Sequence, residues 1–298
     1  MRKLLVSLLL LAAAGAQAGM GLTELPGRQG DGPVTVFYPS SAPDRLLERG
    51  PYKLQLAAEG APVRGNGRLV MISHGSGGAP WTHSDLARKL VDAGFVVAFP
   101  EHLGDNWRGM SAGGHTALAM AGGRWSPSQM RRHCEAHLDD DFPSCVGLAT
   151  RLRGNFMDGV KKAIAIRMIR FRLDDANWYT HDDPRVKAVV AEVPYAVDFD
   201  MASLARPRVP LGIVQNGKDK WLAPAYHSGA VLRACSGCEL VADLPTAGHG
   251  SLLSPPPPFD RLPEIAADLL GDPPGFDRAL VPATQDRIVA FFRRHLLP

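Results

Sequence analysis

A serine, an aspartate and a histidine lie along this chain in an order and in surroundings that suit acyl transfer. Ser111 is the centre of the pentapeptide Gly109-Met110-Ser111-Ala112-Gly113, and Asp219 and His249 follow it in that order. A serine hydroxyl is a weak nucleophile at neutral pH, so it needs a base within hydrogen-bond reach and a third group that orients the base. His249 can be that base and Asp219 can orient it.

The sequence around each candidate predicts its position. Asp219 follows the apolar run 209–215, which reads as a strand, and Glu192 at the end of the preceding strand, 186–193, is the rival acid. His249 follows the strand predicted at 239–244, in Ala247-Gly248-His249-Gly250. Side chains just beyond the ends of parallel strands gather at one edge of a sheet. A surface histidine and a turn aspartate are the alternatives for these two residues.

A glycine-rich loop, His74-Gly75-Ser76-Gly77-Gly78, follows the apolar strand predicted at 69–73. Acyl transfer builds negative charge on the carbonyl oxygen, and backbone N–H groups of such a loop can stabilise it. We predict oxyanion donors from Gly75, Ser76 or Gly77 and from Ala112, which follows the serine. A phosphate-binding loop is excluded, because neither Gly-Lys-Ser/Thr nor a G-x-G-x-x-G helix start is present.

These motifs resemble the dienelactone hydrolase-like branch of the α/β-hydrolases, with exported members related to platelet-activating-factor acetylhydrolases and bacterial polyester hydrolases. The likeness is carried by 74–78, 100–106, 109–118, 217–224 and 247–250. It implies an α/β-hydrolase fold, ester or lactone hydrolysis, no cofactor, and triad roles for Ser111, Asp219 and His249. Dienelactone hydrolases themselves use a cysteine nucleophile, so the serine here favours an esterase.

The pattern breaks immediately before the serine. Only ten residues separate Pro100, at the end of a predicted strand, from Ser111. Two parallel strands need a connection of roughly a dozen residues or more. We therefore expect the crossover helix and the central strand that should lead to the serine to be missing. A non-catalytic or degenerate hydrolase-fold protein that binds a small molecule or a partner is the alternative function, and a secreted peptidase is a more distant one.

The apolar runs alternate with helical patterns, which predicts a mostly parallel central sheet flanked by helices in one domain, 19–298. Strands are expected at 34–38 and 52–57, as an antiparallel pair at the sheet edge, and at 95–99. Helices are expected at 83–93, 114–121, 224–234 and 285–296. Residues 122–183 have an irregular pattern and are predicted to form an inserted lid or cap.

The first eighteen residues carry Arg2 and Lys3, an apolar stretch, and Ala16-Gln17-Ala18. This arrangement predicts a secretory signal cleaved after Ala18 and a periplasmic or secreted protein with no later membrane span. In that compartment the four cysteines favour disulfides. Three pairings are possible, of which the simplest is local, Cys134–Cys145 and Cys235–Cys238, and a redox or metal role for the C-x-x-C is the alternative.

Composition excludes further classes. Of the 298 residues 45% are hydrophobic and 21% charged, as in ordinary globular proteins. The formal net charge is +3 and no long basic run occurs, so nucleic acid is not an expected partner. The expected ligand is a small ester or lactone, with no metal.

Overall fold

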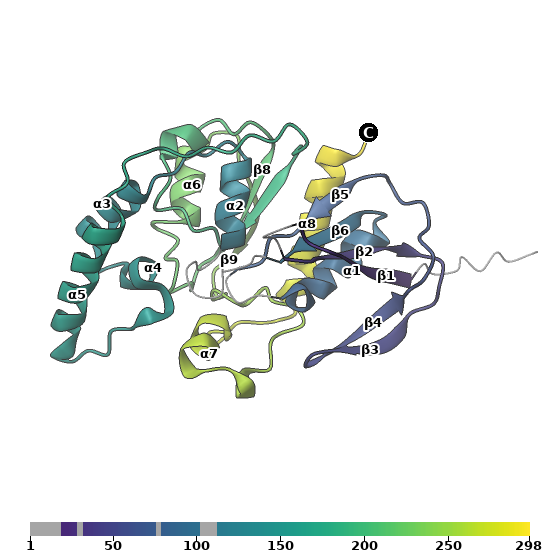
Figure 1. Cartoon of the computed structure of the whole chain (residues 1–298), viewed down its shortest axis with the longest axis horizontal. Helices are drawn as coiled ribbons and strands as arrows, with labels where there is room; N and C mark the ends of the chain where they lie inside the picture. Colours follow the sequence, from purple (N-terminus) through teal and green to yellow (C-terminus); the bar gives the residue numbers. More distant parts are fainter. Residues whose placement is uncertain (1–18, 29–31, 76–78, 102–111) are drawn as a thin grey trace, which may run out of the picture.

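The computed structural model describes residues 19–28, 32–75, 79–101 and 112–298. Their strands form two separate sheets (Figure 1). The larger sheet has the order β3-β4-β1-β2-β6-β5, and the smaller has the order β7-β8-β9. The strands are β1 Gly19–Leu25, β2 Val34–Ser40, β3 Arg45–Arg49, β4 Tyr52–Ala58, β5 Leu69–Met71, β6 Val96–Pro100, β7 Val189–Glu192, β8 Leu211–Asn216 and β9 Glu239–Leu244.

The start of the chain departs from the sequence prediction. The strands expected at 34–38 and 52–57 exist as β2 and β4, but they are not neighbours. β1 lies between them, antiparallel to β2 and parallel to β4. β3 forms the edge of the sheet and pairs antiparallel with β4. The prediction that these two strands pair with each other was therefore wrong, because β1, from earlier in the chain, lies between them.

The smaller sheet is parallel throughout, with β8 in its centre. Five of the six residues of β8 are buried, as is expected of a strand covered on both faces. Successive side chains of β8 enter different clusters, since Ile213 packs with α2 and Val214 packs with α8. The carboxyl ends of β7, β8 and β9 consequently point to the same edge.

Helices cover both faces of the smaller sheet and one face of the larger sheet. α1 (Ser84–Asp92) and α8 (Leu280–Leu296) pack in one cluster with strands of both sheets, including Phe99 and Val241. α2 (Ala112–Met120) and α6 (Ser228–Ala234) pack on the other face of the smaller sheet. Because α8 contacts both α1 and β9, it helps to hold the two sheets together.

Residues 122–183 contain three helices, which lie at the opposite end of the molecule from the β3–β4 hairpin (Figure 1). These are α3 (Pro127–His137), α4 (Phe142–Val146) and α5 (Met157–Arg172). A further helix, α7 (Glu264–Leu270), and short 3-10 turns at Pro80–His83, Gly147–Ala149, Met201–Leu204 and Phe259–Arg261 complete the elements. No helix among the described residues is long and apolar enough to cross a bilayer.

Two disulfides are present, Cys134–Cys145 and Cys235–Cys238. The first joins α3 to α4, with 5.8 Å between the Cα atoms. The second closes the turn between α6 and β9. The local pairing predicted from the sequence is confirmed, and two structural disulfides are consistent with an oxidising compartment. The predicted signal, residues 1–18, lies outside the described residues.

A gap separates the two sheets. In the described parts of the chain, β6 is followed by α2, and no strand joins β5 to β7. Leu69 and Met71 of β5 are 55% and 63% exposed, although a central strand would bury both. Residues 102–111, between β6 and α2, lie outside the described residues. The predicted absence of the strand leading to Ser111 falls on those residues, and the strands of the described residues form two separate sheets.

Candidate active site

His249 and Asp219 meet at the carboxyl edge of the smaller sheet. His249 Nδ1 lies 2.7 Å from Asp219 Oδ2, and the two side chains are 8% and 2% exposed. The second carboxylate oxygen of Asp219 accepts hydrogen bonds from the backbone N–H groups of Trp221 (2.9 Å) and Leu222 (2.8 Å). An ionised carboxylate only accepts hydrogen bonds, so Nδ1 of His249 donates. In the neutral ring Nε2 then has the lone pair that a general base needs.

The loops that carry the two residues are tied together by hydrogen bonds. The Asn216 side-chain amide donates to the Gly248 carbonyl at 2.7 Å, and the backbone N–H of Lys218 donates to the Ala247 carbonyl at 2.9 Å. The N–H of Gly248 donates to the Ser251 hydroxyl at 2.9 Å. Asp219 comes three residues after β8, and His249 comes five residues after β9. The parallel pairing of these strands therefore positions both side chains.

Ser111, the predicted nucleophile, lies outside the described residues, but the helix that follows it is described. α2 begins at Ala112, and its first turn is packed tightly against backbone on two sides. A Cβ atom on Gly113 would lie 1.9 Å from the Ser73 carbonyl oxygen. A Cβ on Gly114 would lie 2.6 Å from Pro194 Cα. The two glycines allow α2 to begin between the end of β5 and the end of β7.

The predicted oxyanion loop is described in part. Gly75 is described, whereas Ser76 and Gly77 lie outside the described residues. Gly75, Gly113 and His249 all line one cavity of about 850 Å³. The structure thus brings together part of the loop after β5, the start of α2 and His249. For Ala112 only its backbone position, at the first residue of α2, is described.

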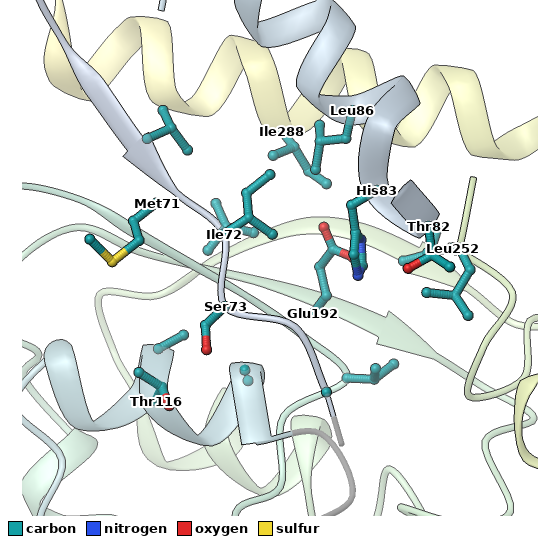
Figure 2. Close-up of a pocket in the computed structure, with 18 of the residues that line it drawn as sticks. Met71, Ile72, Ser73, Thr82, His83, Leu86, Thr116, Glu192, Leu252 and Ile288 are labelled. Atoms are coloured by element: carbon teal, nitrogen blue, oxygen red, sulfur yellow. The ribbon is translucent and has the colours of Figure 1, made fainter. Parts of the chain in front are cut away.

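Glu192, the rival acid, is at the end of β7 and lines the same cavity, whereas His249 is paired with Asp219. Burial raises the pKa of Glu192 from its ordinary 4.5 to about 7. His83 also lines the cavity, and its pKa is lowered to about 4 by burial and, less strongly, by His74. Figure 2 shows both side chains pointing into the cavity, beside Ile72 and Leu86. Both groups are largely neutral near pH 6.

The raised pKa of Glu192 makes stability depend on pH. The folded protein holds this proton up to about pH 7, whereas the unfolded chain loses it near 4.5. Below pH 4.5 the buried Glu192 therefore makes its full contribution to the free energy of unfolding. As the pH rises through 7 this contribution is lost, and the free energy of unfolding falls by about 3 kcal/mol at most. Glu192→Gln should remove that part of the decline. Urea unfolding of the wild-type protein and of Glu192→Gln at pH 5 and pH 8 measures this fall. An equal change in the free energy of unfolding for the two proteins would contradict the raised pKa.

One polar pair near the site was not found from the sequence. His115 of α2 lies 2.9 Å from Asp198 through Nε2 and Oδ2, and its ring is 4.7 Å from that of Phe199 and 5.3 Å from that of Trp125. The pair fixes α2 to the segment after β7. In the sequence, only the position of His115 directly after Gly113-Gly114 indicates that it lies near the site. Nothing in the sequence identifies Asp198 as its partner.

Metal binding and redox chemistry have little support in the described residues. No group of His, Cys, Asp and Glu within the described ranges is arranged to bind a metal ion. Cys235 and Cys238 are bonded to each other in the turn after α6, not at the start of a helix as in thioredoxin-like motifs. Their disulfide is a structural link.

Comparisons with known proteins give the fold. No protein-family model matches the chain, and no curated protein matches it. The chain is similar to the solved structure of a ferulic acid esterase from Streptomyces cinnamoneus, at 18% sequence identity and a TM-score of 0.52. The match covers 95% of this chain and 91% of that chain. The strand pairings of the two sheets together are more often parallel than antiparallel, helices pack on both sheets, and the chain has the α/β-hydrolase fold, as the sequence predicted.

Proposed function

We propose that this protein is an exported serine hydrolase that cleaves carboxylic esters or lactones through Ser111, His249 and Asp219. The observation that carries the proposal is the 2.7 Å hydrogen bond between His249 and Asp219 at a cavity shared with Gly75 and the start of α2. The fold is that of the ferulic acid esterase, which cleaves an ester. The two disulfides support export.

The proposed mechanism gives each of these residues a role. His249 Nε2 takes the proton of the Ser111 hydroxyl as its oxygen attacks the ester carbonyl carbon. Asp219 keeps the proton of His249 on Nδ1 and stabilises the imidazolium that forms. Backbone N–H groups of Ala112 and of the loop 75–77 stabilise the oxyanion. The alcohol leaves with the proton from His249, and a water molecule, activated by the same ring, then releases the acid from Ser111.

The buried position of Asp219 suits this role. A carboxylate removed from water is costly unless it is hydrogen-bonded, and Asp219 has three donors, namely His249 and the two backbone N–H groups. These donors use both oxygens of the carboxylate and fix its plane. The imidazole is consequently held by a rigid partner rather than by a mobile surface side chain.

Hydrolysis of nitrophenyl acetate by the purified mature protein and by Ser111→Ala tests the proposal. We expect hydrolysis by the wild-type protein and a loss of at least about 10³-fold in kcat for the variant. A matched control is Ser203→Ala, at the 3-10 turn Met201–Leu204, away from the cavity. Equal rates for wild type and Ser111→Ala would refute the assignment of the nucleophile.

The divided sheet supports a second candidate, a hydrolase-fold protein that binds a small molecule without cleaving it. A serine mechanism needs Ser111 within about 3 Å of His249, and the strand that the sequence predicts to be missing would be one support of that geometry. Under this alternative, a folded wild-type protein would hydrolyse no ester, and ligand binding would survive replacement of Ser111 and His249. The same assay therefore separates the two functions.

A further inference from the structure

The cavity beside His249 continues along the gap between the two sheets. Its lining begins at His249, Gly75 and Leu253 near the carboxyl edge and reaches Arg68, Lys187 and Leu296 at the opposite edge. Between these ends it follows the full length of β5 and of β7. At about 850 Å³ it is within the range of 300 to 1,000 Å³ that is typical of small-molecule sites.

The walls of this gap are mainly apolar, and most of the apolar side chains come from β5, β7, α1, α2 and α8. The apolar lining includes Leu69, Val70, Met71 and Ile72 at β5, Leu86 and Leu90 on α1, Val189 and Val190 on β7, Ala117 and Met120 on α2, and Ile288, Phe292 and Leu296 on α8. Figure 2 shows Ile72, Leu86 and Ile288 around the same space. Such walls favour an apolar occupant, because burial of apolar surface is the main gain available there.

The polar groups along the gap are few and carry little charge. Ser73, Thr82 and Thr116 contribute hydroxyl groups. His83 and Glu192 are largely neutral near pH 6, because burial lowers the pKa of His83 to about 4 and raises that of Glu192 to about 7. The charged residues of the lining, among them Arg68, Arg185 and Lys187, are at the end remote from His249. A flexible hydrocarbon can therefore extend from His249 along β5 without meeting a fixed charge in the middle.

We propose that this gap holds the hydrocarbon part of a long-chain acyl ester, with the ester group at His249 and the chain extending between the two sheets. This inference rests on the proposed function, and it names the substrate class of that site. The chain would occupy the place that a central strand has in an undivided sheet. Full burial of each added methylene raises affinity about fourfold, so long acyl chains should be strongly preferred.

The first test is a series of nitrophenyl esters from acetate through octanoate to decanoate. We expect kcat/KM to rise by at least about 100-fold from acetate to decanoate at pH 6. Val190→Phe, which fills the gap from β7, should lower the decanoate-to-acetate ratio at least tenfold. The same substitution at Val63, which is exposed and does not line the cavity, should leave the ratio unchanged. A flat series in the wild-type protein would overturn the inference and leave the proposed function intact.

The second test does not depend on hydrolysis. A fluorescent long-chain fatty acid is titrated into Ser111→Ala and into the same protein carrying Val190→Phe, after circular dichroism shows that both are folded. We expect saturable binding that the filled gap weakens at least tenfold. Saturable binding by Ser111→Ala, together with no ester hydrolysis by the folded wild-type protein, would support the apolar site and refute the proposed function. Equal binding with and without Val190→Phe, or displacement of the probe only by extended peptides, would contradict the inference.

Discussion

Asp219→Asn is expected to lower kcat for nitrophenyl acetate by about 10⁴-fold, with a much smaller change in KM. The amide cannot keep the proton of His249 on Nδ1 as the carboxylate does at 2.7 Å, so Nε2 no longer reliably presents a lone pair. In serine hydrolases with the same arrangement, replacing the carboxylate that orients the histidine lowers kcat by about this factor. Stopped-flow or plate-reader kinetics at pH 7 and pH 9 measure it.

Two controls make the result specific. Asp243→Asn changes an exposed aspartate on β9 in the same way and should leave kcat unchanged. Glu192→Gln tests the rival acid, and its kcat should stay within about threefold of the wild-type value at pH 6, where Glu192 is largely protonated. If Glu192→Gln caused the large loss and Asp219→Asn did not, Glu192 would be the orienting acid, and the assignment of Asp219 would be wrong.

Gly113→Ala is expected to destabilise the protein by about 3 kcal/mol or more and to lower kcat by at least 100-fold. The added methyl group would lie 1.9 Å from the Ser73 carbonyl oxygen, which is backbone and cannot turn away. α2 must then move from the end of β5, and overpacking of this kind is costly. Ala112 moves with the helix, and a displacement of about 1 Å near reacting groups costs about 100-fold in rate.

The matched control for this variant is Gly159→Ala. Gly159 also lies in a helix, α5, and a Cβ there would meet nothing within 4 Å. The substitution should leave kcat unchanged and increase stability by about 0.5 to 1 kcal/mol, because alanine favours helix more than glycine does. Thermal unfolding of both variants gives the comparison. A Gly113→Ala protein as stable and as active as Gly159→Ala would contradict the packing around the start of α2.

Most of the site's framework could be predicted from the sequence because it depends on local patterns. The strands β8 and β9 are apolar runs followed by turn residues, and parallel strands bring the residues after them to one edge. The sequence predicts Asp219 and His249 at this edge, and the structure has them in contact. The break before Ser111 was predicted from chain length alone, since ten residues cannot form a parallel crossover.

The features that were missed depend on contacts between distant residues. β3 is a five-residue edge strand with arginine at both ends, so it has little apolar signal. β1 enters the sheet between β2 and β4, and no local pattern specifies which strand fills that space. α5 buries Ile169 yet exposes Ile164 and Phe171, so its sequence lacks a clear apolar face. The cavity arises only because the two sheets remain apart, and the sequence alone gives neither its walls nor its extent.

The most direct test of the account is covalent labelling of the purified mature protein with a fluorophosphonate, followed by peptide mapping. Such a probe reacts with a serine that is activated by a base, so it reports on Ser111 and His249 together. We expect one adduct per protein, on Ser111, that is lost in His249→Ala and greatly slowed in Asp219→Asn. A folded protein that takes no label, or takes it equally after His249→Ala, would contradict the serine mechanism.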